Sequence, residues 1–104
     1  LYREPGERPD LDTVLAPSEL ILAVQLPELR WTRSMYLKLR DRESYAFALA
    51  SVAVALRIED ARIADLRIAL GGLASRPWRC RAAEDAVRGR VLDPALAKHA
   101  AALC

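Results

Sequence analysis

The chain has 104 residues, of which 53% are apolar and 29% charged, so it can form one domain with a core but is too short for two. Its 16 basic and 14 acidic side chains leave a net charge of +2, and this balance argues against a dedicated nucleic-acid binder. No apolar run reaches the ~18–20 residues that a membrane span needs, and because Leu1-Tyr2-Arg3-Glu4-Pro5 contains no apolar h-region, we do not expect a signal peptide there. Because the first residue is not Met, we expect the sequence to be part of a longer chain.

Prolines bound the first apolar segment. Prolines and charged residues are interspersed through residues 1–17, which predicts an extended lead-in. Residues 20–26 are apolar, partly β-branched and followed by Pro27, so we predict a strand there. Its larger apolar side chains share one face: Leu20, Leu22, Val24 and Leu26. Ile21 lies on the opposite, smaller face.

Residues 33–40 alternate in polarity, which predicts a second strand before a charged loop at 41–44. One face is apolar, and the other carries an aromatic ring and two cations: Met35, Leu37 and Leu39 against Tyr36, Lys38 and Arg40. Lys38 in mid-strand has two interpretations. It stays solvated, or it points at an anionic or electron-rich ligand with Arg42 in support, and the spacing alone leaves both open.

Residues 47–58 fit two patterns, because their alanines favour a helix and their apolar residues recur with a period of two. We predict a strand for the second half, since a turn at Glu59-Asp60 and a further strand at 64–70 complete a hairpin. The predicted inward face of that further strand comprises Ala64, Leu66, Ile68 and Leu70. Gly71-Gly72 ends it as a turn, and no phosphate-loop glycine pattern surrounds this pair.

After Pro77 the apolar period becomes helical. The predicted buried face of the first helix comprises Trp78, Ala82, Ala86 and Val87, with Trp78 as a core anchor. Gly89 suits the position after its end, and Asp93-Pro94 suits the start of a second helix whose apolar face is Leu96, Ala100 and Leu103. This order predicts a single α+β domain over residues 1–104: a small antiparallel sheet of three to four strands followed by helices packed on one face.

Residues suited to catalysis or metal binding are scarce. Cys80 and Cys104 are too few for a disulfide framework, although one bridge between them stays open. Together with His99, which we predict on a helix surface, they do not supply a zinc site. No G-x-S-x-G elbow is present, so a complete enzyme is not expected. The arginines clustered over 76–90 are interpreted as a solvated helix face, because acidic residues lie among them.

Four ordered segments resemble a known family. They are L-A-P-S-E-L-I with L-P within 15–27, Y-L-K-L-R-D-R-E-S-Y-A-F-A at 36–48, I-A-L-G-G-L-A at 68–74 and R-P-W-R at 76–79. They are similar to the C-terminal domain of the FAD-binding (medium) subunit of molybdenum hydroxylases, the carbon monoxide dehydrogenase, xanthine dehydrogenase and aldehyde oxidoreductase family. Ala46, where many members have Asp, makes the chain more similar to bacterial aldehyde oxidoreductases. Cys80 replaces a common alanine.

The resemblance implies that this domain closes over the flavin of FAD and that Ile21, Lys38 and Arg42 lie beside the cofactor. Ile21 is then an apolar contact, Lys38 approaches the polar edge of the ring, and Arg42 belongs to a mobile loop next to it. The implied partners are N-terminal FAD-binding domains of the same subunit, absent from this sequence, an iron–sulfur subunit and a molybdenum-cofactor subunit. Catalytic residues, metal ligands, nucleic acid and a membrane span are not expected.

The expected function is that of an accessory domain of an oxidoreductase. It closes the flavin pocket of this flavoprotein, supports electron transfer from iron–sulfur clusters to FAD and an external acceptor, and is not catalytic or FAD-retaining in isolation. The alternative is a non-catalytic protein-interaction module that kept the fold without the cofactor. The expected compartment is the cytoplasm, or the periplasm if a complex is exported whole.

Overall fold

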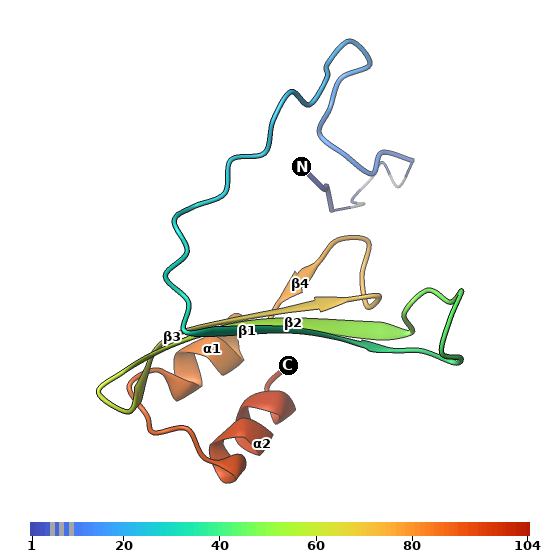
Figure 1. Ribbon diagram of the computed structural model, residues 1–104. Helices are drawn as coiled ribbons and strands as arrows, with labels where there is room; N and C mark the ends of the chain where they lie inside the picture. The colour runs from blue at the N-terminus through green and yellow to red at the C-terminus, as the bar shows by residue number, and fades with distance from the viewer. Residues whose placement is uncertain (5, 7, 9) are drawn as a thin grey trace.

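The computed structural model, which describes residues 1–4, 6, 8 and 10–104, contains a four-stranded antiparallel sheet followed by two helices. The strands lie in the order β1 (Arg33–Leu39), β2 (Ala50–Glu59), β3 (Arg62–Gly71) and β4 (Trp78–Arg79). Helices α1 (Arg81–Val87) and α2 (Pro94–Ala102) lie on one side of this sheet (Figure 1). The predicted α+β class is confirmed. Within the described residues, no helix has the length and apolarity that crossing a membrane requires.

A β-bulge in β3 decides which side chains are buried. The ladder between β2 and β3 shifts register between Arg57 and Ile58 and leaves Ala64 without a partner. The extra residue brings Ile63 onto the same face as Leu66, and Ile63 is 1% exposed. The prediction that Ala64 faces the core was therefore wrong, because a period of two does not continue through a bulge.

The turn of this hairpin is Asp60-Ala61, one residue later than predicted. Both residues have positive φ, 49° and 61°, which a two-residue turn needs to match the twist of the strands. Glu59 is still paired with Arg62, so it belongs to the ladder and not to the turn.

The chain reaches α1 through a strand. Trp78 and Arg79 pair with the edge of β3, so the predicted helix start at Trp78 was wrong. Trp78 is 54% exposed and does not anchor the core. The buried face of α1 is shifted from the predicted one and comprises Ala83, Glu84 and Val87. Pairing along β3 holds the residues after Pro77 in an extended conformation, and the helix begins only after Cys80.

The start of α2 and its inner face agree with the prediction. Asp93 Oδ1 accepts the backbone N–H of Leu96 at 2.7 Å, and Pro94 occupies the first turn. Leu96 and Ala100 are buried, whereas Leu103 is 41% exposed because the helix ends before it. Gly89, after α1, has the expected positive φ of 76°.

The core lies between β3 and the two helices. Its buried residues are Ile63, Leu66, Ile68, Cys80, Ala83, Val87, Leu96 and Ala100. Helix α1 contacts β3, and α2 contacts α1 without close backbone contact to a strand. The helices therefore cover the β3 side of the sheet, and the β1 side of the same face is left open.

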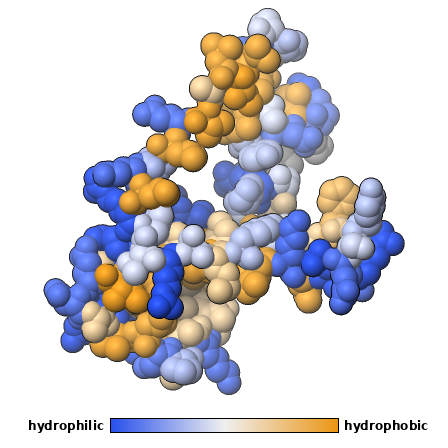
Figure 2. All heavy atoms as spheres, in the orientation of Figure 1, coloured by the Kyte–Doolittle hydropathy of each residue, from blue (hydrophilic) through white to orange (hydrophobic). Residues whose placement is uncertain are grey.

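The strand predicted at residues 20–26 does not form. This segment is an irregular chain that rises on the side of the sheet opposite the helices (Figure 1). Among the described residues, its backbone has no hydrogen-bond partner, and a strand exists only in a ladder. Hydrophobic side chains gather along this rising segment (Figure 2). Pro5 and Pro9, which supported the lead-in prediction, lie outside the described residues.

Candidate functional site

A hollow of about 600 Å³ lies beside Lys38, near the end of β1. Lys38 and Tyr36 reach it from the outer face of β1, the face turned away from the helices. The loop between β1 and β2 and the end of β3 supply the other walls. The lining residues are Tyr36, Lys38, Tyr45, Ala46, Phe47, Ala48 and Gly72. Three aromatic rings and one ammonium group therefore surround one hollow.

Lys38 is held over an aromatic face. Its Nζ lies 5.9 Å from the centroid of the Tyr36 ring, within the range of a cation–π contact. The two residues are two positions apart on one strand and so share a face. Among the described residues, no carboxylate forms an ion pair with Lys38. Its charge is consequently free to attract an anionic or electron-rich group.

Arg42 shapes the loop that forms one wall of the hollow. Its Nε donates to the carbonyl oxygen of Tyr45 at 3.1 Å, and its Nη2 donates to the same oxygen. Tyr45 has a φ of 52°, a conformation that costs energy in a non-glycine residue. The N–H of Leu49 donates to Leu39 O at 2.8 Å and closes the loop on the sheet. Arg42 thus holds Tyr45 in place without lining the hollow itself.

The glycine pair permits a close approach of β3 to its neighbours. A Cβ on Gly71 would lie 2.5 Å from Ser51 Oγ. A Cβ on Gly72, whose φ is 82°, would lie 2.9 Å from the carbonyl oxygen of Leu49. The predicted turn is confirmed at Gly72, and the structure adds a packing reason there, because Leu49 O is a backbone atom. At Gly71 the Ser51 hydroxyl can rotate away from a new Cβ.

The structure brings two of the three predicted site residues together. Lys38 lines the hollow and Arg42 holds its loop, whereas Ile21 lies on the irregular segment and is 47% exposed. Ile21 is not among the residues that line the hollow. Tyr45 and Phe47 were not predicted as site residues. They are 97% and 100% exposed, and two aromatic residues beside a charged loop were the available signal.

The thiols and the histidine lie outside this hollow. Cys80 is buried and Cys104 exposed, and both are free. Burial raises the pKa of the Cys80 thiol to about 12, and the neighbouring Cys104 adds to the effect, so Cys80 is a poor nucleophile. His99 is exposed on α2, as predicted. No group of three His, Cys, Asp or Glu residues suited to a metal ion occurs in the described part of the chain.

An ion pair between the buried Glu84 and the partly exposed Arg79 holds α1 against the sheet. Glu84 Oε1 accepts the backbone N–H of Ile68 and Nε of Arg79, each at 2.8 Å. Its Oε2 accepts Arg79 Nη2 at 2.6 Å. These hydrogen bonds, with Arg79 first, hold the pKa of Glu84 below its ordinary value. Glu84 therefore stabilises the packing of α1 on the sheet and does not line the hollow.

Known proteins resemble this chain in sequence and in structure. The family model of the CO dehydrogenase flavoprotein C-terminal domain matches residues 35–104. The aldehyde oxidoreductase FAD-binding subunit PaoB of Escherichia coli is 47% identical over 83 residues, covering 80% of this chain and 25% of that protein. The nicotine 6-hydroxylase medium subunit of Paenarthrobacter nicotinovorans is 38% identical over 90 residues, covering 85% of this chain and 30% of that subunit.

The chain is similar to solved structures as well as to these relatives in sequence. Quinoline 2-oxidoreductase from Pseudomonas putida 86 superposes with a TM-score of 0.65 at 30% identity, covering 74% of this chain and 26% of that one. The carbon monoxide dehydrogenase of Hydrogenophaga pseudoflava superposes with a TM-score of 0.62 at 31% identity, covering 67% and 24%. This chain spans 25% to 30% of the length of the curated relatives that it matches. The chain belongs to the CO dehydrogenase flavoprotein C-terminal domain family.

Proposed function

We propose that this chain acts in an FAD-binding subunit of a molybdenum hydroxylase, where it closes over the flavin. There it supports electron transfer from iron–sulfur clusters to FAD and an external acceptor. The observation that carries this proposal is the ammonium of Lys38, which has no ion-pair partner among the described residues and lies in a hollow walled by aromatic rings. The similarity to proteins named as FAD-binding or medium subunits supports it.

The chemistry of the hollow fits one part of FAD. An isoalloxazine ring is flat, aromatic and electron-rich at its polar edge, which suits aromatic walls and one nearby cation. The chain has no glycine motif of a phosphate-binding loop. Proposed partners are therefore N-terminal FAD-binding domains that hold the pyrophosphate, with iron–sulfur and molybdenum-cofactor subunits beyond them.

Each residue has a separate proposed role. When bound, FAD accepts and releases the electrons, and Lys38 stabilises negative charge at its ring edge. Tyr45 and Phe47 exclude water from the ring, and Arg42 keeps their loop in position. Ile21 is retained as a proposed apolar contact to the flavin. The proposed compartment is the cytoplasm, or the periplasm after export of the whole complex.

Titration of FAD by fluorescence quenching tests the cofactor role. The titration is made on this chain and on a protein extended upstream through the same reading frame. We expect binding only by the extended protein, because the pyrophosphate site lies outside this chain. Absence of binding by both proteins would favour the alternative, an interaction module without cofactor.

Lys38→Ala in the flavin-loaded subunit tests the proposed contact. Loss of the ammonium is expected to slow flavin reduction roughly tenfold, which corresponds to ~1.4 kcal/mol of transition-state stabilisation. Lys98→Ala is the matched control, because Lys98 is the other lysine of the chain and is exposed on α2. Lys38→Arg keeps the charge and should recover part of the rate. Flavin spectra and turnover that do not change in Lys38→Ala would remove Lys38 from the proposed mechanism.

A further inference from the structure

Residues 20–26 present a row of apolar side chains without cover. The exposed fractions are 80% for Leu20, 89% for Leu22, 77% for Val24 and 78% for Leu26. These side chains occupy alternate positions, so they form one face of the segment whenever it is extended as a strand. The backbone N–H and C=O groups of the segment also have no hydrogen-bond partner in the described part of the chain. The segment therefore has the properties of a strand that lacks its sheet.

The sheet of this chain does not supply the missing partner. Its edge strands are β1 and the short β4, and the described backbone of residues 20–26 forms no hydrogen bond with either strand (Figure 1). One attachment lies after the segment, where the N–H of Thr32 donates to Leu56 O at 2.8 Å. The other lies before it, where Glu4 forms an ion pair with Arg76 in the loop between β3 and β4. Residues 20–26 lie between these two attachments and away from the sheet.

The similarity to FAD-binding subunits bears on where a partner strand could come from. The matched family model begins only at residue 35, so residues 20–26 lie outside the part of the chain that it matches. The stretches shared with the curated relatives are longer than the part matched by the family model, and they extend upstream of it. Most of each relative lies outside the shared stretch. Stretches of these lengths in a 104-residue chain necessarily include residues 22–26.

We infer that residues 20–26 become a β-strand by adding to an exposed sheet edge in the FAD-binding part of the same subunit. The main chain supplies the ladder hydrogen bonds, and the four exposed apolar side chains enter the core beneath that sheet. Ile21, on the opposite face, then points away from that core. The identity of the partner domain rests on the proposed function, whereas the need for a partner strand rests on the unpaired backbone and the exposed side chains.

Hydrogen exchange of the backbone amides of residues 20–26 tests the inference, read by mass spectrometry on this chain and on the complete FAD-loaded subunit. We expect unprotected rates in this chain and at least hundredfold protection in the subunit. The double variant Leu22→Asp, Val24→Asp should abolish the protection. Both side chains are exposed in this chain, so circular dichroism of the 104-residue protein should not change. Leu29→Asp is the matched control, since Leu29 is 84% exposed and lies outside the segment.

The outcomes separate the inference from the proposed function. Unprotected amides in a subunit that retains FAD would overturn the inference and leave the flavin role intact. Protection in a subunit that binds no FAD would support strand addition and reject the flavin role. Protection in this chain alone, together with a dimer in sedimentation, would assign the strand to a second copy and overturn the inference. Equal loss of protection in Leu29→Asp would also overturn it.

Discussion

Residues 20–26 and strand β3 have the same alternating apolar pattern but opposite surroundings. In β3, Ile63, Leu66 and Ile68 are at most 8% exposed, because β2 and β4 pair with the strand and α1 covers it. In the N-terminal segment, the four apolar residues at alternate positions, Leu20, Leu22, Val24 and Leu26, are at least 77% exposed. Alternation specifies which side chains share a face. The presence of a neighbouring strand depends on residues elsewhere in the fold.

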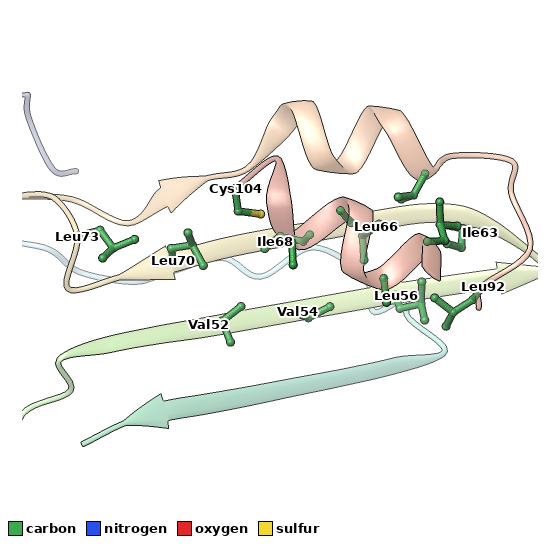
Figure 3. Close-up of a pocket in the computed structure, with 15 residues that line it drawn as sticks. Val52, Val54, Leu56, Ile63, Leu66, Ile68, Leu70, Leu73, Leu92 and Cys104 are labelled. Atoms are coloured by element: carbon green, nitrogen blue, oxygen red, sulfur yellow. The ribbon is translucent and has the colours of Figure 1, made fainter. Parts of the chain in front are cut away.

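Strand β1 is intermediate between these two regions. It is paired with β2, yet Met35, Leu37 and Leu39 are 57% to 65% exposed on the face that carries the helices. An apolar groove of about 620 Å³ separates α2 from the sheet (Figure 3). Its sheet wall comprises cross-strand partners of β2 and β3, Val52, Val54 and Leu56 beside Leu70, Ile68 and Leu66, and its other wall comprises Leu96, Ala97, Ala100 and Ala101 of α2. Pairing with a neighbouring strand and cover by a helix are therefore separate conditions for burial. Of the three regions compared, only β3 meets both.

The largest difference in stability is expected between two variants that each truncate one apolar side chain, one in β3 and one in residues 20–26. Ile63→Ala should lower the free energy of unfolding by about 3–4 kcal/mol, because it opens a cavity at a fully buried position. Leu22→Ala in this 104-residue protein should change it by less than about 0.5 kcal/mol, because that side chain is already in water. Urea denaturation measures both values. Similar losses in the two variants would refute the contrast between the regions.

The next largest loss of stability is expected from removing the carboxylate charge of Glu84, which holds α1 on β3. Glu84→Gln should cost about 2–3 kcal/mol, because the amide leaves Arg79 without its anion while Arg79 remains partly solvated. The ionised carboxylate stabilises the fold above its ordinary pKa of 4.5, and this contribution is lost as the pH falls through the lowered folded-state pKa. The parent protein should therefore lose stability below about pH 4.5, and the variant should lose less. Parallel pH profiles by urea denaturation would contradict this role.

The smallest losses of stability are expected from alanine substitutions at two glycines. Comparing the two variants distinguishes backbone strain from steric contact. Gly72→Ala should cost about 2 kcal/mol, because its φ is 82° and the new Cβ would meet Leu49 O. Gly89→Ala should cost about 1 kcal/mol, because its φ is 76° but no atom lies within 4 Å of the new Cβ. Thermal unfolding ranks the two variants. Equal costs would mean that the contact between Gly72 and the loop beside the hollow adds nothing.

Much of the candidate site was predictable because it depends on neighbouring residues in the chain. Alternation along β1 placed Lys38 and Tyr36 on the face away from the apolar side chains, and the structure confirms this. The position of Phe47 in the hollow was not predictable, because it depends on where Leu49 rejoins the sheet and on how closely Gly72 approaches. The burial of Glu84 was missed for the same reason, since its partners lie on β3 and β4.

The order of strands and helices, the faces of β1, the glycine turn and the cap of α2 were predictable from local sequence, because they depend on residues close together in the chain. The tertiary structure alone decided the bulge at Ala64, the strand at Trp78 and the absence of a strand at 20–26. A ladder hydrogen bond joins two segments, and its free energy is gained only when both are in place. For this reason the same apolar alternation forms a buried strand in β3 and an uncovered segment at 20–26.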